Sequence, residues 1–405
     1  MTDETRMPVA PKRREGLQAE GAYVPSELPV GIRVVPSGVD QVATEHLVIN
    51  VGPQHPSTHG VLRMIVEADG EQIVGAEMVL GQLHRGIEKL AEHRRYNAVG
   101  TLLDRGDYLS GVHGELAFAL ATEKLAGIEV PAKADWIRTL GSELTRLASH
   151  LVWYATFGLD AGAMGQMLYA FRDREVLIDI IEAITGSRMM FNYVRPGGVV
   201  ADLPAGIDEK IRTFLKDFAI HIEEHDQLLG GNEIMQLRAK GVGIIGGDTA
   251  VAFSLTGANL RAAGLGYDVR REHPYAAYPH VEFDVPVAHE GDCWARYVVR
   301  MEEMRQAARI IEQCLDGMPE GEHTAKVAKV LRPGEGEAYA AVESPRGEWG
   351  IHIVSDGSDR PYRMRYRPPA LFAVQAVEAI MPGLLIADAI VAGGSVDLIL
   401  GETDR

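Results

Sequence analysis

The amino-acid sequence predicts an α+β fold, with a mainly helical body and small antiparallel β regions towards the two ends of the chain. Apolar residues recur at spacings of three and four over long stretches of residues 83–330, which is typical of helices. Short stretches of β-forming residues with turn signals lie at 47–82 and 337–367 and predict strands.

These patterns divide the chain into four expected segments. They are an extended N-terminal arm at 1–46, a β region at 47–82, the helical body at 83–330, and a C-terminal β region and tail at 331–405. The arm is rich in Pro, Gly and scattered charge and lacks an apolar signal core, which leaves a free tail and a docking arm as alternatives. A chain of 405 residues can bury a large core.

The expected strands carry clear turn signals. Asp69-Gly70 separates the β-forming residues 64–66 and 73–74, which predicts a hairpin. Residues 337–367 favour antiparallel strands with a turn at Asp356-Gly357.

Three helices are expected from their apolar spacing. The first follows Pro131, has Asp135 as its expected cap, and buries Ile137, Leu140, Leu144, Leu147 and Leu151. The second begins near Asp208 and buries Ile207, Ile211, Phe214, Phe218 and Ile222. The third covers 293–315 and is expected to bury Val298, Met301, Ile311 and Leu315. Residues 241–291 are rich in Gly and Pro and predict loops with short turns.

Charge and cysteine content exclude several classes of protein. A formal charge of −17 argues against binding nucleic acid or anionic lipid, so partner subunits would have to hold the chain at a membrane. Uninterrupted apolar stretches of about 18 residues are absent. The chain has two cysteines, Cys293 and Cys314, and no CxxC pair. It therefore cannot form a disulfide scaffold or supply the four thiolates that an iron–sulfur cluster normally takes.

The segment Gly52–Gly60 contains the most informative motif, in which His55 and His59 lie four residues apart among two prolines and two glycines. Proline fixes φ and glycine permits unusual dihedral angles, so we expect a rigid loop that holds an imidazole in place. Imidazole exchanges protons near neutral pH, which points to proton chemistry at the mouth of a cavity. A metal site and plain hydrogen bonding to the loop backbone are the alternatives, although no spacing nearby supplies further metal ligands.

Two further polar residues are candidates for chemistry. Tyr108 precedes an apolar helix and could present its hydroxyl group to a cavity, or could simply be half-buried packing. Asp160 lies at a helix end among apolar and small residues, where an unpaired carboxylate is costly and a histidine or arginine partner is natural. A helix cap or loop hydrogen bond is the alternative for Asp160.

Other charged groups have structural interpretations. Glu143, Arg146 and His150 fall on one helix stripe and predict a salt-bridged layer between helices. Residues 172–175 form a charge cluster that we expect to be solvated or paired. Motifs for dinucleotides, phosphate loops and serine hydrolases are absent from the sequence.

A series of motifs carries a resemblance to a known family. In order along the chain they are Gly52 to Gly60 with Leu62-Arg63, His84 to Lys89, Asp104 to Tyr108, Asn192 to Arg195, Leu260 to Ala262, Tyr267 to Arg270, Glu343 to Glu348, Ser395 to Asp397 and the end at Asp404-Arg405. Together they resemble the family of the 49-kDa, or D-type, subunit of bacterial NADH:quinone oxidoreductase (complex I), over residues 46–405.

That family is similar to the large subunit of nickel–iron hydrogenases, which implies a hydrogenase-like fold. Hydrogenases hold their metal with two CxxC pairs, and the matching positions here are Asp107 with Ser110 and Ile399 with Glu402. Because soft thiolate ligands are missing at all four, we expect no metal in this chain and a quinone headgroup in the former metal cavity.

The resemblance implies roles for particular residues. His59 and Tyr108 would hold the quinone and supply protons for its reduction to quinol, coupled to proton translocation, with His55 nearby and Asp160 behind His59. Arg105 would lie near the terminal [4Fe–4S] cluster of a partner subunit.

The resemblance also implies partner subunits and a location in the cell. The partners are a small iron–sulfur subunit of the B type, a subunit of the C type, a membrane subunit of the H type and the rest of the peripheral arm. The location is the cytoplasmic side of the inner (plasma) membrane, reached through partners. Many relatives carry a histidine where this chain has Met190, so we expect the potential of the neighbouring cluster to depend weakly on pH.

Three competing interpretations accompany this resemblance. A membrane-bound hydrogenase large subunit is disfavoured by the missing cysteines. A related complex linked to ferredoxin or F420 would use the same quinone module, because other subunits set the electron donor. A non-catalytic scaffold would not need the set His59, Tyr108 and Asp160.

Overall fold

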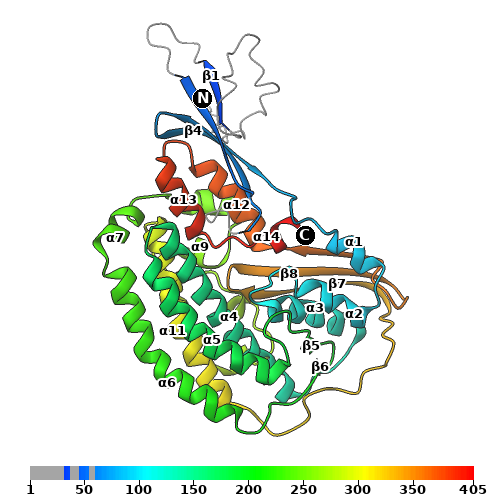
Figure 1. The fold of residues 1–405 in the computed structure, drawn as a ribbon. Helices are drawn as coiled ribbons and strands as arrows, with labels where there is room; N and C mark the ends of the chain where they lie inside the picture. The colour runs from blue at the N-terminus through cyan, green and yellow to red at the C-terminus, as the bar shows by residue number, and fades with distance from the viewer. Residues whose placement is uncertain (1–31, 37–44, 54–59) are drawn as a thin grey trace, which may run out of the picture.

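Four long helices form the largest layer of the molecule, and the fold is the α+β class that the sequence predicts (Figure 1). The computed structural model describes residues 32–36, 45–53 and 60–405. The four helices are α4 (Ala132–Asp160), α5 (Met164–Thr185), α6 (Ile207–His225) and α11 (Cys293–Gly317). Each packs against two of the others, in the order α4, α5, α6, α11 and back to α4.

The expected helices are present, with two corrections in detail. The five apolar residues expected to line α4 are buried, and α6 begins at Ile207 as expected. Asp135 lies in the first turn of α4 and is not its cap, because the helix already starts after Pro131. Met301 and Ile311 of α11 are buried, but the expectation for Val298 is wrong, since it is 44% exposed. The side chain of Asp292 caps α11 by accepting a hydrogen bond from the Ala295 amide at 2.7 Å.

A three-stranded antiparallel sheet crosses the molecule beside the helices (Figure 1). Its strands are β7 (Glu335–Ser344), β8 (Gly347–Asp356) and β9 (Arg363–Arg367). The turn expected at Asp356-Gly357 is confirmed, because β8 ends at Asp356 and pairs with β9. Helix α3 (Gly111–Ala126) packs on β7 and β8, α2 (Tyr96–Leu103) packs on α3, and α1 (Ile87–Glu92) packs on β9.

A four-stranded antiparallel sheet stands at the other end, formed by β1 (Ile32–Pro36), β2 (Glu45–Val51), β3 (Arg63–Asp69) and β4 (Gln72–Val79). The hairpin expected at Asp69-Gly70 is confirmed between β3 and β4. Alternate residues of β3, including Met64 and Val66, are buried in one cluster with residues of the C-terminal helices. Strand β1 falls within the segment expected as an extended arm and adds to the sheet through β2.

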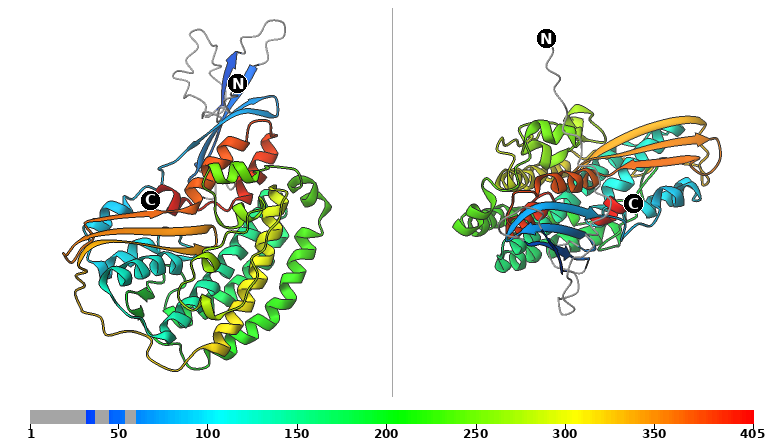
Figure 2. Two further views of the ribbon diagram at one scale, coloured as in Figure 1. Left: turned by 180° about the vertical axis from the view of Figure 1, so that it is seen from behind. Right: turned by 90° about the horizontal axis from the view of Figure 1, so that it is seen from above.

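The expected C-terminal tail folds into three helices that the local sequence pattern does not indicate. They are α12 (Pro369–Ile380), α13 (Ile386–Ser395) and α14 (Leu400–Asp404). Helix α12 packs on β4 and α13 packs on α4, so the last residues lie in the middle of the molecule (Figure 2).

Short elements connect these layers. They are β5 (Val194–Arg195), β6 (Gly198–Val199), the π-helical turn η2 (Asp226–Gly230), α7 (Glu233–Ala239), α8 (Gly247–Ala252), α9 (Gly257–Arg261), α10 (Val269–Glu272) and the 3₁₀ turn η3 (Tyr278–His280). The loops expected at 241–291 therefore contain short helices, and α9 is buried along its whole length.

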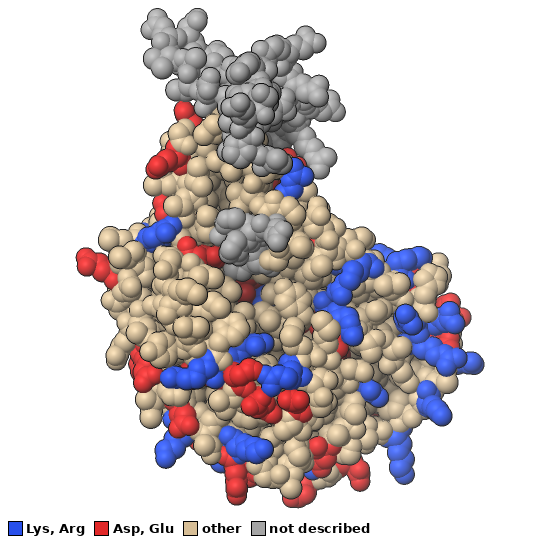
Figure 3. All heavy atoms as spheres, in the orientation of Figure 1, with Lys and Arg blue, Asp and Glu red and all other residues tan. Residues whose placement is uncertain are grey.

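The visible surface carries both signs of charge (Figure 3). Lys and Arg side chains gather over the side of the molecule where α1 and the tips of the three-stranded sheet lie, whereas acidic and basic groups are mixed over the long helices. Within the described ranges, none of the helices is long and apolar enough to cross a bilayer.

Candidate functional site

Tyr108 lies in the short connection between α2 and α3 and is half-buried against α14. A Cβ atom added to Gly401 would come within 3.2 Å of Tyr108 Cδ1 and 2.5 Å of the Gly106 carbonyl oxygen. Glycine at position 401 therefore allows the loop that carries Tyr108 to touch the first turn of α14. The tyrosine ring is held from one side by this contact.

Asp160 is the last residue of α4, as expected, and its carboxyl group lies against Gly394 of α13. A Cβ atom added to Gly394 would come within 3.2 Å of Asp160 Cγ and would overlap the Oδ2 atom. The Trp153 indole donates a hydrogen bond to the Gly394 carbonyl oxygen at 3.1 Å and fixes the backbone here. Helices α4 and α13 therefore meet at the expected carboxylate.

The first described residue after the histidine loop lies beside α14. His55 and His59 lie outside the described residues, so the expectations for them remain predictions. Gly60, the first described residue after them, lies next to α14, since a Cβ atom added there would be 3.8 Å from Leu400 Cδ1. Leu400 directly precedes Gly401, the residue that contacts Tyr108. The described chain therefore resumes, after the histidine loop, close to the Tyr108 contact.

Residues 394–402, which we call the C-terminal segment, are the common neighbour of these groups. Asp160 contacts it at Gly394, Gly60 approaches it at Leu400, and Tyr108 contacts it at Gly401. The structure therefore brings two of the expected site residues and the end of the histidine loop to one short stretch of chain. Nothing in local spacing links these positions, which come from four distant parts of the sequence.

A buried ionic cluster lies behind Tyr108, and its central arginine is not marked by any local sequence pattern. Arg346, in the turn between β7 and β8, donates to Asp107 Oδ2 at 2.7 Å, to Ser149 Oγ at 3.1 Å and to Asp397 Oδ1 at 3.4 Å. Ser110 also donates its hydroxyl hydrogen bond to Asp107. The guanidinium group thus ties the Tyr108 loop to α4 and to the C-terminal segment.

The cluster has more carboxyl groups than cations. Asp107, Asp397 and Glu402 are all buried, Arg346 faces all three, and Arg300 also faces Asp397. Burial raises the pKa of Glu402 to about 8, and the neighbouring Asp107 carboxylate adds to this effect. The Glu402 carboxyl group is therefore mainly protonated at neutral pH.

The same surroundings keep Tyr108 in its neutral form. Burial raises the pKa of the Tyr108 phenol above its ordinary value, while Arg346 opposes the rise and the carboxylates of Asp107 and Asp397 add to it. A neutral phenol is a hydrogen-bond donor and carries a transferable proton. Tyr108 is thus prepared to donate towards a group that gains negative charge.

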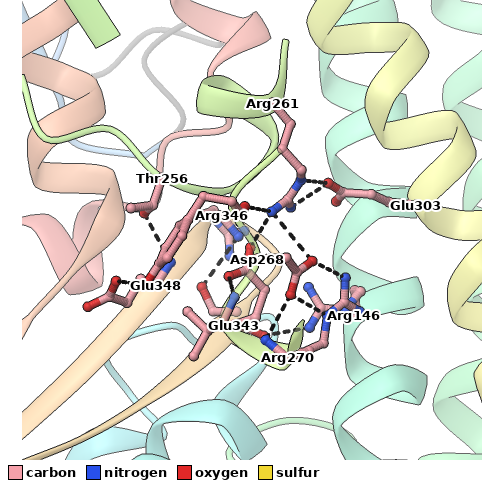
Figure 4. Close-up of polar contacts among 12 residues, drawn as sticks. Arg146, Thr256, Arg261, Asp268, Arg270, Glu303, Glu343, Arg346 and Glu348 are labelled. Atoms are coloured by element: carbon pink, nitrogen blue, oxygen red, sulfur yellow. Dashed lines mark hydrogen bonds and ion pairs between the residues drawn. The ribbon is translucent and has the colours of Figure 1, made fainter. Parts of the chain in front are cut away.

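A larger ionic layer continues from this cluster into the helical body (Figure 4). Arg261 pairs with Glu303 at 2.6 Å and with Glu343 at 2.8 Å. Arg270 pairs with Asp268 at 2.7 Å and with Glu143 at 3.1 Å. These side chains are buried, where an unpaired charge is costly, and the close pairing compensates their charges.

The expected stripe on α4 belongs to this layer. Arg146 pairs with Glu143 at 3.0 Å, and His150 contacts Glu303 of α11 at 3.0 Å. The prediction of a salt-bridged layer between helices is therefore confirmed. In the cluster at 172–175, Arg172 pairs with Asp173 at 2.8 Å.

Arg105 lies three residues before Tyr108 in the same connection between α2 and α3 and is partly exposed. It donates to Asp104 Oδ1 at 2.9 Å, and Arg85 donates to its carbonyl oxygen at 2.7 Å. Met190 is also exposed and adopts a positive φ of 56°. Both residues are therefore accessible to a neighbouring protein.

Potential metal ligands are dispersed in the part of the chain that the structure describes. Within it, no three His, Cys, Asp or Glu side chains are grouped so as to hold a metal ion. Cys293 and Cys314 are buried free thiols. At the positions matching hydrogenase cysteines, Asp107 and Ser110 bond to each other, and Glu402 accepts a hydrogen bond from the Ala370 amide at 2.9 Å.

Comparisons with known proteins agree with the resemblance. The model of the family described as respiratory-chain NADH dehydrogenase, 49-kDa subunit, matches residues 160–335 and 322–405. The D-type subunit of NADH-quinone oxidoreductase from Carboxydothermus hydrogenoformans is 47% identical over 361 residues, covering 89% of this chain and 99% of the relative. The same subunit from Bacillus anthracis is 44% identical over 364 residues, covering 90% and 100%. That from Acidothermus cellulolyticus is 44% identical over 413 residues, covering 91% and 94%. The chain therefore belongs to the family of the 49-kDa, D-type subunit of the respiratory NADH:quinone oxidoreductase known as complex I.

Proposed function

We propose that this chain is the quinone-binding subunit of a proton-pumping NADH:quinone oxidoreductase, in which Tyr108 and His59 hold the quinone headgroup. The observation that carries the proposal is the meeting of Tyr108, Asp160 and the end of the histidine loop at the C-terminal segment. A scaffold would have no need for a neutral phenol and a carboxylate held at the same segment.

The chemistry of these groups suits quinone reduction. Reduction to quinol takes two electrons and two protons, and both quinone oxygens gain negative charge unless donors meet them. The Tyr108 hydroxyl group would donate to one oxygen and the His59 imidazolium to the other. Asp160 would orient the His59 imidazole and favour its protonated form, and His55 would lie near the quinone in the same loop.

Electrons would reach the quinone from a partner. The chain has two cysteines, fewer than the four thiolates of a typical iron–sulfur cluster, so the terminal [4Fe–4S] cluster would lie in a small B-type subunit. Arg105, partly exposed beside the Tyr108 loop, would face that cluster. Contacts with C-type and H-type subunits would hold the chain on the cytoplasmic side of the inner membrane, without a nucleic-acid partner.

Substitution of the two headgroup residues in the assembled complex tests this proposal. Tyr108→Phe and His59→Ala are each expected to lower NADH:quinone turnover by about 100-fold, because each removes a proton donor. Reduction of ferricyanide, which bypasses the quinone, should stay normal. Tyr362→Phe is the matched control, since Tyr362 is 68% exposed. Near-normal quinone turnover in both site variants would refute the proposal.

A further inference from the structure

We propose that Glu402 is a stored proton for the Tyr108 site, which returns a proton to Tyr108 after the tyrosine has given its own to the acceptor. The inference rests on the proposed function and assigns Glu402 a role that acts through Tyr108. In this role Glu402 supplies a proton to Tyr108 and acts on the quinone only through Tyr108.

The position of Glu402 is the first support. It follows Gly401, whose backbone approaches the Tyr108 ring, and it lies on the same buried turn of α14. When ionised, Glu402 raises the pKa of Tyr108, as the carboxylates of Asp107 and Asp397 do, so the two titrating groups are electrostatic neighbours. Glu402 is therefore the next residue after the one that contacts the Tyr108 ring.

The hydrogen bonding of Glu402 is the second support. Its Oε1 atom accepts from the Ala370 amide at the start of α12, at 2.9 Å. In the described structure its Oε2 atom has no hydrogen-bond partner, and neither has Oδ2 of Asp397. Two unpaired carboxyl oxygens in one buried cluster are costly if both groups are ionised, and a proton on one of them removes much of that cost.

Charged groups face Glu402 from several of the elements packed around it. The Tyr108 loop contributes Asp107, the β7–β8 turn contributes Arg346, and the link before α14 contributes Asp397. From α12 the Ala370 amide faces it, and from β9 Tyr366 donates to its backbone carbonyl oxygen at 3.3 Å. Arg346 thus faces all three carboxyl groups and Arg300 also faces Asp397, and the excess of three carboxyl groups over two arginines favours a bound proton.

The proton balance of the step is simple. In the proposed reaction the quinone would gain two electrons supplied by the partner subunit and two protons, one from the Tyr108 hydroxyl group and one from His59, and would become quinol. The tyrosinate left behind is a stronger base than the Glu402 carboxylate, since the pKa of Tyr108 lies above 10 and that of Glu402 is about 8. The proton therefore moves from Glu402 to Tyr108, and protons from solvent restore Glu402 and His59 before the next turnover.

Glu402→Gln separates this role from a structural one. Glutamine keeps the acceptor for the Ala370 amide and the shape of a neutral carboxyl group, but carries no transferable proton. In the purified complex we expect kcat for quinone reduction to fall about tenfold at pH 6.5 with KM unchanged, a smaller loss than that of a direct proton donor because water can substitute. The gap to the wild type should close as the pH rises above 8, where wild-type Glu402 is itself ionised.

Infrared difference spectra of quinone reduction give a second readout. The signal of a protonated carboxyl group that loses its proton should be present in the wild type and absent in Glu402→Gln. Glu115→Gln is the matched control, because Glu115 is equally buried, has a pKa raised to about 8 and also has one unpaired oxygen. This control should keep both the wild-type pH profile of turnover and the infrared signal.

The outcomes are distinguishable from a failure of the proposed function. Wild-type turnover and pH profile in Glu402→Gln, with turnover lost in Tyr108→Phe, would overturn the stored proton and leave Tyr108 in place. Wild-type turnover in both variants would refute the proposed site itself. If the complex with Glu402→Gln does not assemble, the Asp107→Asn variant tests the inference instead. Removing this carboxylate should move the alkaline fall in turnover to lower pH, and an unmoved profile would overturn the inference.

Discussion

Arg346 is the residue on which the polar site most depends. Its guanidinium group joins Asp107, Ser149 and Asp397, which lie in three distant parts of the chain. Its partner Asp107 is 239 residues away along the chain, so no local pattern could have identified the pair. Asp160 was identifiable because its own sequence surroundings are unusual, whereas the family resemblance was needed to single out Tyr108, and Arg346 stands out only as part of a family motif.

Loss of Arg346 should destabilise the fold as well as the site. We expect Arg346→Ala to lower the free energy of unfolding by about 3–5 kcal/mol, because it leaves buried carboxylates without their cation. Arg360→Ala should change it by less than about 0.5 kcal/mol, since Arg360 is an exposed residue with one loose ion pair at 3.6 Å. Urea unfolding of the full chain measures both, and equal effects would contradict the role given to Arg346.

At the scale of elements, a regular spacing of apolar residues predicts a helix reliably. A helix that is stabilised by contacts from distant residues cannot be recognised from its own sequence. Helices α4, α6 and α11 carry regular apolar stripes and are predictable from them. Helix α13 contains Gly393 and Gly394, which disfavour helix, and is held by contacts from α11. There Arg296 donates to Ser395 Oγ at 2.9 Å, and Arg300 donates to the Ser395 carbonyl oxygen at 2.8 Å. Such contacts come from about 100 residues away and leave no local signal.

The two adjacent glycines of α13 allow a matched test of the Asp160 contact. An alanine at position 394 would displace the Asp160 carboxyl group, whereas space is open around an added Cβ atom at position 393. If Asp160 orients His59 as proposed, we expect Gly394→Ala to reduce quinone turnover of the complex by about tenfold, because it shifts this orienting group. Gly393→Ala should be close to the wild type. Similar turnover in the two variants would show that the position of Asp160 is unimportant.

At the scale of the whole molecule, the buried carboxyl groups fall into two sets whose contributions to stability change with pH in opposite directions. Burial raises the pKa of Glu115 and Glu402 to about 8 and that of Glu343 to about 7. Arginine neighbours hold the pKa of Asp268 down to about 2, although its burial opposes them. The sequence shows how many acids the chain has, but the folded environment decides which of them are protonated.

The pH dependence of stability follows from these shifts. A carboxyl group with a raised folded pKa contributes stability that is complete below its unfolded pKa of 4.5 and is lost as the pH rises through 7 to 8. Asp268 acts in the opposite sense, and its contribution is lost as the pH falls from 3.8 to about 2. We therefore expect the unfolding temperature of the full chain to peak at mildly acidic pH. Thermal scans from pH 4 to 9 should show a shallower alkaline decline in Glu115→Gln, and an identical decline would contradict the assignment.

The order of synthesis gives the C-terminal segment a further consequence. Residues 394–402 leave the ribosome after the loop of Tyr108, the end of α4 and the turn of Arg346 have already been made. Until then the Tyr108 ring lacks its glycine neighbour, and Arg346 lacks one of its carboxylate partners. The site is therefore completed only after translation has passed these residues, and any assembly factor that binds the nascent chain earlier meets an unfinished site.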